Sequence, residues 1–359
     1  MSIKAVTAAY EDFLRESLPV VGKDLDLKHR QMAQAVFPFL RSTFYRWSGL
    51  FREICPELAQ APSLLAVGDL HVENFGTWRD GEGRLIWGVN DVDEAQDMPF
   101  AIDLVRLATS ALLASEEASL GLDAGEICAA ILEGYQEQLE KGGRPFVLEE
   151  EHGWLRILAT GSLRDPVAFW DKIGRLPSAE PPDHVIALLT AHLPKGARPE
   201  RFASRTAGLG SLGRPRFLAL ADYDGGKVTR EAKAMLPSGW NWSLGQTAPL
   251  RCGAILSRAK RCPDPFLTFA TDQGGKSGWA IRRLAPHCSR VEMADLPHRR
   301  DELKLLRAMG KETANLHLGS ADRIDAVRED LQRRPGHWLK HAASLMAEAT
   351  HRDWQDWRG

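Results

Sequence analysis

The sequence predicts an α+β protein in which one sheet-rich segment lies between two helical segments. Two observations lead to this prediction. Apolar residues recur at helical spacing before residue 60 and again after about residue 299, whereas sustained strand patterns are confined to residues 203–285. The length of 359 residues is typical of two domains or of one large domain with two lobes.

The first part of the chain is expected to begin with helices over residues 1–60. Short apolar runs predict strands at residues 63–67 and 84–89, and the turn-forming residues 80–83 lie between them. Each of these strands would deliver acidic residues at its end. Residues 99–140 then have the apolar spacing of two long helices.

The second part of the chain alternates between short helices and strands. Prolines break residues 141–200 into short helical pieces. Strands are expected at residues 217–220, 227–235 and 280–281, and residues 224–226 have the Asp-Gly-Gly chemistry of a hairpin turn. The sequence therefore predicts that the sheet is antiparallel.

Composition excludes several classes of protein. Hydrophobic residues make up 44% and charged residues 26% of the chain, which are ordinary globular values. The net charge of -2 disfavours a nucleic-acid binder, and no uncharged apolar run is long enough to span a membrane. The acidic residues Glu11, Asp12 and Glu16 are unlike a secretory signal. Five cysteines, an odd number without C-x-x-C spacing, favour a reducing compartment, so we expect a cytoplasmic protein.

The densest group of acidic and polar residues follows the first predicted strand. It reads Gly68-Asp69-Leu70-His71-Val72-Glu73-Asn74-Phe75-Gly76, and Asp91 and Asp93 follow the second strand. Mg²⁺ prefers oxygen ligands from one or two side chains and from substrate phosphates, which Asn74 and Asp91 could supply if the two strand ends lie side by side, with Asp93 available to a second ion. Asp69 would then be left to accept a proton from an attacking hydroxyl or to orient it. Either segment alone is equally typical of a turn.

A second motif lies in the sheet-rich segment, where Gly208, Gly210 and Gly213 form G-x-G-x-x-G with Ser211 between them. A proline and a strand follow, not a helix, so the motif favours a hairpin over nucleotide phosphates rather than a dinucleotide-binding turn. A plain tight hairpin is about as consistent with these residues.

The strand after this hairpin carries two basic residues that could hold phosphates. Side chains alternate along a strand, so only one of Lys233 and Arg230 can point into the cleft, and the sequence leaves both open. An ordinary solvated strand is the alternative.

These motifs resemble those of aminoglycoside and choline kinases. Gly68-Asp69-Leu70-His71-x-x-Asn74 is similar to their catalytic loop, and Asn90-Asp91-Val92-Asp93-Glu94-Ala95 to their metal-binding segment. In those kinases the glycine loop, the lysine and the helix that leads into the catalytic loop come first. Here residues 208–213, Lys233 and the similar helix ending at Leu316-His317 come last. The resemblance implies a circularly permuted, two-lobed protein-kinase-like fold with a small antiparallel sheet lobe and a larger helical lobe.

The chain also resembles the bacterial family called domain of unknown function 2252. The similarity lies in residues 68–76, 90–95, 208–213 and 230–232, with Phe37-Pro38-Phe39-Leu40-Arg41 as an upstream element. Arg230 stands where that family has a lysine. The two resemblances imply a division into residues 1–200 (helical, with the catalytic and metal loops), 201–285 (nucleotide-binding) and 286–359 (returning helices).

The function implied is Mg²⁺- and ATP-dependent phosphoryl transfer to a hydroxyl of an unidentified small molecule. Asp69 is the expected catalytic residue, and His71 either shares that role or braces the loop by hydrogen bonds. Asp103 is expected to anchor the loop. The acceptor pocket is expected from the N-terminal helices and residues 141–200. Two alternatives stay open: transfer of AMP on the same scaffold, and a non-catalytic nucleotide-binding protein. The sequence does not define the oligomeric state.

Overall fold

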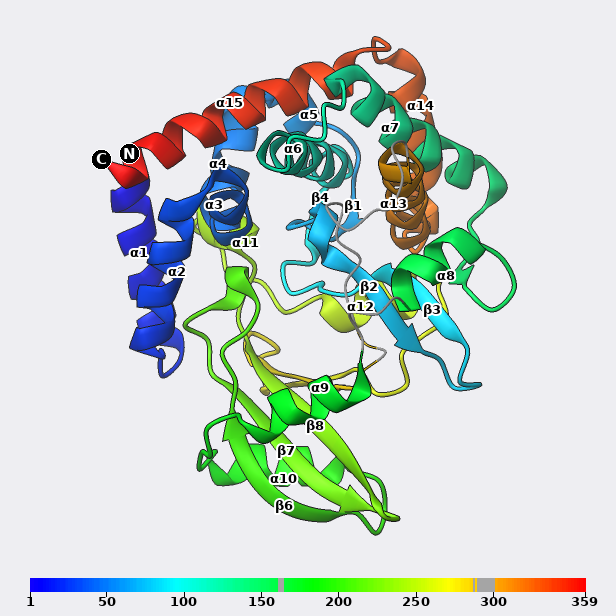
Figure 1. Cartoon of the computed structure of the whole chain (residues 1–359). Helices are drawn as coiled ribbons and strands as arrows, with labels where there is room; N and C mark the ends of the chain where they lie inside the picture. The colour runs from blue at the N-terminus through cyan, green and yellow to red at the C-terminus, as the bar shows by residue number, and fades with distance from the viewer. Residues whose placement is uncertain (161–164, 287, 289–300) are drawn as a thin grey trace.

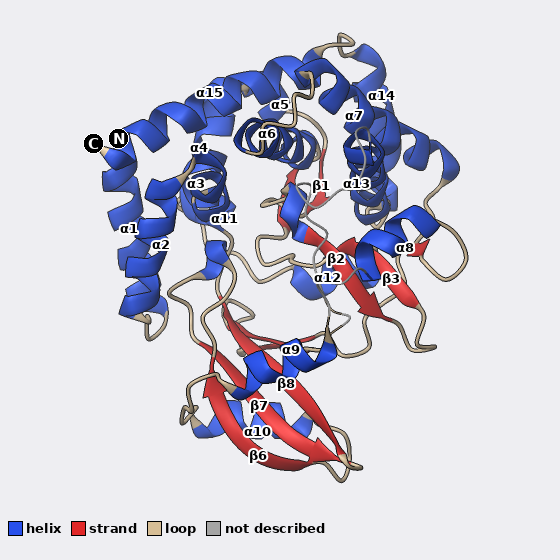
Figure 2. Cartoon of the chain, viewed as in Figure 1, coloured by secondary structure: helices blue, strands red, loops and turns tan. Residues whose placement is uncertain are grey.

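The structure is a computed structural model of the whole chain, and it describes residues 1–160, 165–286, 288 and 301–359. Helices form most of one part of the molecule, and an antiparallel sheet forms a smaller lobe beside it (Figures 1 and 2). The α+β class predicted from the sequence is confirmed. No helix among the described residues is long and apolar enough to cross a membrane.

The helical part is built around α6 (Ala101–Glu117), whose side chains are buried on nearly every side. Its sequence is apolar over most of its surface because α3, α7, α13 and α15 pack around it. The other helices of this part are α1 (Ile3–Ser17), α2 (Gly22–Gln34), α3 (Val36–Ser42), α4 (Phe44–Ile54), α5 (Pro56–Ala59), α7 (Ala124–Lys141), α8 (Gly153–Thr160), α11 (Gly239–Ser243), α12 (Cys252–Arg258), α13 (Asp301–His317), α14 (Ile324–Arg333) and α15 (Trp338–Arg358).

Two small sheets lie against these helices and carry the acidic loops. In one, β1 (Ser63–Ala66) pairs with β4 (Gln96–Pro99); in the other, β3 (Leu85–Val89) lies between β2 (Phe75–Arg79) and β5 (Phe146–Val147). The strands expected before Asp69 and Asp91 are confirmed as β1 and β3. The turn at residues 80–83 joins β2 to β3. The sequence pattern did not predict β2.

The sheet lobe has five antiparallel strands in the order β6-β7-β8-β10-β9. The strands are β6 (Arg198–Ser204), β7 (Arg216–Tyr223), β8 (Gly226–Met235), β9 (Thr268–Thr271) and β10 (Gly278–Arg283). Asp224 and Gly225 join β7 to β8 with φ of 49° and 79°, as a two-residue hairpin turn of the predicted kind requires.

Two helices cover opposite faces of this sheet (Figure 1). Ile173 of α9 (Pro166–Gly174) packs with Leu218 and Leu220, whereas α10 (Asp183–Ala191) packs against Ala219 and Ala232. Both helices fall in the segment 1–200 that was expected in the helical part. Conversely, α11 packs against α4 and α12 against α13, although both lie between strands of the sheet lobe.

The two ends of the chain lie side by side (Figure 1). Ile3 of α1 belongs to the same apolar cluster as Trp354 and Trp357 of α15. All five cysteines lie in described residues, and none forms a disulfide.

Candidate functional site

The loop after β1 is held by the buried carboxylate of Asp103, on α6. Its two oxygens accept hydrogen bonds from the backbone N–H groups of Val67 and Gly68, both at 2.7 Å. His317, at the end of α13, contacts the same carboxylate through Nε2 at 3.0 Å. The expected anchoring role of Asp103 is confirmed, and His317 ties the last residue of α13 to the same loop.

Asp69, the next residue of this loop, is paired with Arg106 of α6. Arg106 Nε and Nη2 donate to Asp69 Oδ1 at 3.0 and 2.6 Å. Oδ2 lies close to the glycine motif. A Cβ atom added at Gly210 would be 3.7 Å from this oxygen. Burial raises the pKa of Asp69, and the charge and hydrogen bonds of Arg106 oppose this shift.

Asn74 joins the two acidic loops through its side-chain amide. Nδ2 donates to the carbonyl oxygens of Asp69 (3.1 Å) and Asp91 (2.9 Å), and Oδ1 accepts from the Asp91 N–H at 2.9 Å. The two loops therefore lie side by side, as the sequence predicted, and the side chain of Asn74 connects them.

Lys233, on β8, lies between the carboxylates of Asp91 and Asp93. Its Nζ is 3.2 Å from Asp91 Oδ1 and 2.5 Å from Asp93 Oδ2. Burial acts to raise the pKa of Asp91, but the charge of Lys233 prevails and lowers it. Burial, with the neighbouring Asp91, raises the pKa of Asp93 to about 6.

Arg230 lies on the opposite face of β8 from Lys233. It donates to the His192 carbonyl oxygen at 2.9 Å, and its guanidinium lies over the ring of Phe266. Of the two basic residues that the sequence left open, the structure brings Lys233 to the acidic loops and leaves Arg230 on the far side of the strand.

The glycine motif forms the connection between the paired strands β6 and β7, with a short 3₁₀ turn at Leu209–Ser211. Gly208 and Gly213 have φ of 76° and 94°, which side chains other than glycine rarely adopt. Ser211 Oγ accepts from Arg216 at 2.8 Å and so holds the turn to β7. The hairpin predicted from G-x-G-x-x-G is present, with its turn beside Asp69.

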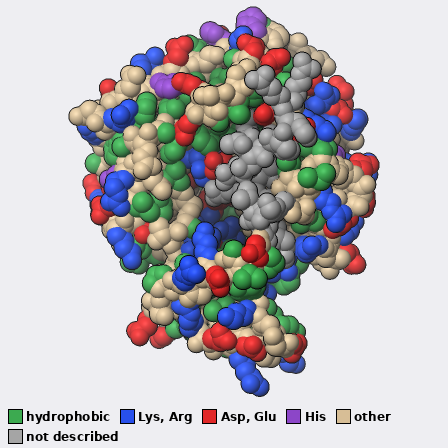
Figure 3. All heavy atoms as spheres, viewed as in Figure 1, with side chains coloured by type: hydrophobic (Ala, Val, Ile, Leu, Met, Phe, Trp, Pro, Cys, Tyr) green, Lys and Arg blue, Asp and Glu red, His purple; other side chains and the backbone are tan. Residues whose placement is uncertain are grey.

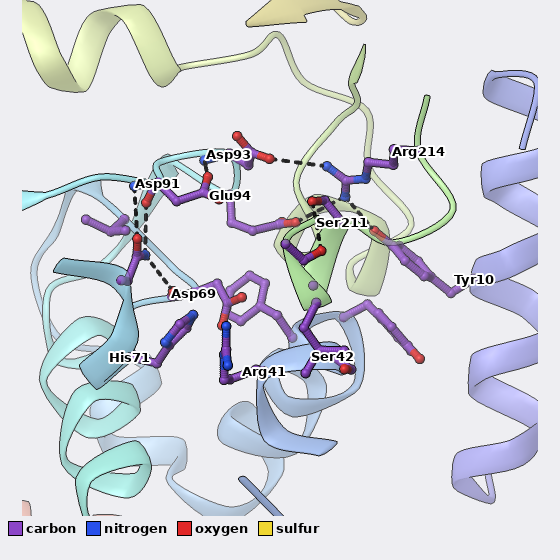
Figure 4. Close-up of a pocket in the computed structure, with 17 residues that line it drawn as sticks. Tyr10, Arg41, Ser42, Asp69, His71, Asp91, Asp93, Glu94, Ser211 and Arg214 are labelled. Carbon is purple, nitrogen blue, oxygen red and sulfur yellow. Dashed lines mark hydrogen bonds and ion pairs between the residues drawn. The ribbon is translucent and has the colours of Figure 1, made fainter. Parts of the chain in front are cut away.

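Arg214, which directly follows the glycine motif, contacts side chains from two distant segments (Figure 4). Arg214 Nη2 donates to the hydroxyl of Tyr10 on α1 at 3.2 Å and to Glu94 at 3.4 Å. Its Nη1 lies 3.7 Å from Asp93 Oδ2. Burial raises the pKa of Tyr10 to about 12. Arg214 thus links the first helix, the segment of residues 90–95 and the glycine motif.

Two connected cavities open beside these residues. The inner cavity, of about 60 Å³, lies beneath the glycine motif and is lined by Tyr10, Arg41, Ser42, Phe44, Tyr45, Val67, Asp69, His71, Asn74, Asp91, Asp93, Glu94, Gly208, Leu209, Gly210, Ser211 and Arg214. The outer cavity, of about 410 Å³, shares His71, Asn74, Asp91 and Gly208 with it. The two therefore form one cleft between the acidic loops and the sheet lobe.

His71 lines both cavities of this cleft, and Glu73 lines the outer one. His71 is nearly buried, with its ring edge-on to Phe37. Glu73 pairs with Arg41, which belongs to the upstream element named above. The N-terminal helices thus line the inner cavity as expected, whereas the segment 141–200 contributes Lys172 to the outer one.

The oxygen atoms near Lys233 fit a hard divalent cation. The Asp91 side chain is 47% exposed, and Asp93 and Asn74 Oδ1 lie beside it. Among the described residues there is no cluster of three or more His, Cys, Asp or Glu side chains arranged to hold a metal. A cation here would be bound by two carboxylates, an amide and substrate phosphates, which is the ligand set that Mg²⁺ favours.

Comparison with known proteins gave one match. Residues 21–157 match the model of a family described as "Uncharacterized protein conserved in bacteria (DUF2252)". No curated protein and no solved structure matches the chain. The matched segment contains Asp69, Asn74 and Asp91, whereas the glycine motif and Lys233 lie beyond it. The chain is therefore similar to this bacterial family over residues 21–157.

Proposed function

We propose that this protein is a Mg²⁺- and ATP-dependent phosphotransferase that acts on a hydroxyl of a small molecule. The observation that carries the proposal is the contact of Lys233 with Asp91 and Asp93, which line one cleft together with Asp69. The loop of Asp69, the segment of Asp91 and Asp93, and the strand of Lys233 meet beside a glycine-rich hairpin. Phosphoryl transfer needs this set of groups, because its catalysis depends on positioning and charge stabilisation.

Each residue has a role that its surroundings support. Asp69 Oδ2, left free by Arg106 on Oδ1, is placed to accept the proton of the acceptor hydroxyl. The acceptor oxygen then bonds to the γ-phosphorus, the bond to the β–γ bridging oxygen breaks, and ADP leaves with that electron pair. Lys233 would exchange part of its contact with the carboxylates for phosphate oxygens. Bound Mg²⁺ would neutralise charge on the phosphates.

The arrangement of elements also supports a kinase-like fold in permuted order. Lys233 lies on the third strand of the sheet lobe, after the glycine hairpin, as the phosphate-binding lysine does in protein kinases. His317, at the end of α13, contacts Asp103 beneath the catalytic loop, although the two are far apart in the sequence. The neighbouring chain ends are compatible with such a permutation.

The experiment uses ATP labelled separately at the α- and γ-phosphates, incubated with Mg²⁺ and a pool of small metabolites. Phosphotransfer predicts that the γ-label passes to an acceptor. Passage of the α-label would instead favour AMP transfer. Asp69→Asn should abolish transfer while leaving nucleotide affinity largely intact, since the amide keeps the shape of the side chain but is not a base.

The control variant is Asp97→Asn, which makes the same chemical change at an exposed carboxylate of β4. It should transfer at the wild-type rate. If Asp69→Asn also turned over at that rate, Asp69 would not be the base. If neither label moved although ATP bound, the non-catalytic alternative would hold.

A further inference from the structure

The face of the small sheet that borders the outer cavity carries charged residues. Glu231 and Lys233 share one face of β8 because side chains alternate along a strand. On the neighbouring strands, Arg216 is directly opposite Lys233, and Arg282 is directly opposite Glu231. Residues directly opposite in an antiparallel sheet point to the same side, so these side chains share one side of the sheet, where Arg216 and Arg282 line the outer cavity.

Three guanidinium groups surround the fully buried carboxylate of Glu231. Arg216 Nη1 and Arg282 Nε each donate to Oε1 at 2.8 Å, and Arg205 pairs with Oε2. Burial acts to raise the pKa of Glu231, but the three arginines prevail and hold it well below the usual range. One negative charge balances one of the three positive charges, so the group as a whole is cationic.

This excess of positive charge faces the outer cavity. The side chains of Arg205 and Arg282 are 24% and 31% exposed. Figure 3 shows basic side chains gathered in the hollow between the sheet lobe and the rest of the molecule. The basic side chains that line the cavity are Lys172, Arg205, Arg216, Arg282 and Arg283.

The acidic residues of the cavity do not offset this charge. Asp91 is paired with Lys233, and Glu73 with Arg41. Asp264 is the remaining acid that lines it among the described residues, and its single charge is smaller than the positive charge that Glu231 leaves unbalanced. The cavity therefore has donors and positive charge that an anion could satisfy.

We propose that Arg205, Arg216 and Arg282 form a second phosphate pocket, beside the Lys233–Asp91 site in the same cleft. Guanidinium groups suit this role because their paired N–H donors match the oxygens of a phosphate. The ligand is a phosphate group of the donor or of the acceptor. Its assignment to a substrate rests on the proposed phosphotransferase function, whereas the affinity of the pocket for phosphate does not.

The test is calorimetric titration of the protein with pyrophosphate in EDTA, so that no metal takes part. The wild-type protein should bind pyrophosphate. Arg282→Gln and Arg205→Gln should each weaken binding by about tenfold or more, since each removes one charged donor. Each variant leaves Glu231 with two arginines, and circular dichroism checks that each is folded.

The matched control is Lys227→Gln, which removes one positive charge from an exposed position near the turn end of β8. It should bind pyrophosphate like the wild-type protein. Absence of binding to the wild-type protein, or equal affinity in all the variants, would overturn the pocket. If Arg282→Gln does not fold, Arg205→Gln decides alone.

A second titration identifies the source of the phosphate and separates this proposal from the preceding one. With a non-hydrolysable ATP analogue and Mg²⁺ at saturation, continued pyrophosphate binding assigns the pocket to the acceptor, and competition assigns it to the donor. If the protein binds Mg-ATP but not pyrophosphate, the proposed function stands and the phosphate pocket is disproved. If the protein binds pyrophosphate but not Mg-ATP, the phosphate pocket stands and the proposed function is disproved.

Discussion

Arg106 is the residue on which the chemistry of Asp69 depends most directly. It is fully buried, its Nη2 also donates to the Leu40 carbonyl oxygen at 2.6 Å, and its guanidinium lies 4.9 Å from the centre of the Trp47 ring. These contacts fix the guanidinium. It therefore holds Oδ1 of Asp69, while Oδ2 lies on the side of the glycine motif. An ion pair in this setting positions a group more than it stabilises the fold.

Removing Arg106 alone should nevertheless destabilise the protein strongly, because a buried charge then loses its partner. Arg106→Met leaves the carboxylate of Asp69 largely buried without its partner, and we expect a loss of about 3–5 kcal/mol in the free energy of unfolding. Urea denaturation measures it. The double variant Arg106→Met/Asp69→Asn should lose less than the sum of the two single variants, because the uncompensated charge is gone. Strict additivity would contradict the coupling of these residues.

Glu231 should contribute to the dependence of stability on pH. Its pKa is lower in the folded than in the unfolded state, so its contribution is fully present above the unfolded pKa of about 4.3 and is lost as the pH falls toward the folded pKa. Between about pH 5 and pH 3, the unfolding free energy of Glu231→Gln should fall less than that of the wild-type protein. Urea denaturation across this range tests it, and parallel curves would disprove it.

At the scale of elements, the glycine motif has a shape that its glycines impose. Gly213 has φ of 94°, and a Cβ there would lie 2.5 Å from Leu25 Cδ2. Gly225, in the β7–β8 turn, also has positive φ, but its Cβ would meet nothing within 4 Å. A substitution at Gly225 therefore introduces backbone strain alone, whereas a substitution at Gly213 introduces backbone strain together with crowding against Leu25.

Gly213→Ala should therefore be more destabilising than Gly225→Ala. The second change costs about 1–2 kcal/mol of backbone strain, and the first adds about 1–3 kcal/mol for overpacking against Leu25 on α2. Urea denaturation of the two variants gives the difference. Equal losses would mean that α2 moves away from the motif at no cost.

The elements that carry the site could be predicted from sequence where local signals are strong. The apolar runs of β1 and β3 and the Asp224-Gly225 turn are such signals. β4 was not predicted, because its four residues include Gln96 and Asp97 and form a strand by pairing with β1. Its structure comes from a tertiary contact that no local pattern contains.

At the scale of the whole molecule, the packing of α1 against α15 brings the chain ends together. Joining residues 359 and 1 by a short Gly/Ser linker should therefore be tolerated, with the chain opened at the exposed residues Lys195 and Gly196 before β6. This permutant would begin with the sheet lobe.

We expect the permutant to fold with an unfolding free energy within about 2 kcal/mol of the wild-type value, because no buried element is cut. Urea denaturation followed by tryptophan fluorescence measures it. A permutant opened inside α6, after Val105, is the control and should not fold, since that helix is buried on nearly every side. Failure of both would show that the original order of the chain is needed for folding.

The candidate site was predictable from sequence as motifs, but its connections were not. The loop of Asp69 and the loop of Asp91 can each be recognised as a motif, because the residues within each loop are close together in the sequence. Arg106 and Arg214 reach the same cleft from α6 and from the end of the glycine motif, and no spacing rule links them to it. The choice between Lys233 and Arg230 needed the register of β8 against β7, which only the folded sheet defines.

The central claim is that Mg²⁺ and a triphosphate bind between the Asp91 segment and Lys233. Calorimetric titration of ATP with and without Mg²⁺, in the wild-type protein and in Lys233→Met and Asp91→Asn, tests it most directly. We predict binding that Mg²⁺ strengthens in the wild-type protein, weaker binding in Lys233→Met, and loss of the Mg²⁺ effect in Asp91→Asn. Absence of ATP binding, or affinity that neither substitution changes, would contradict the claim.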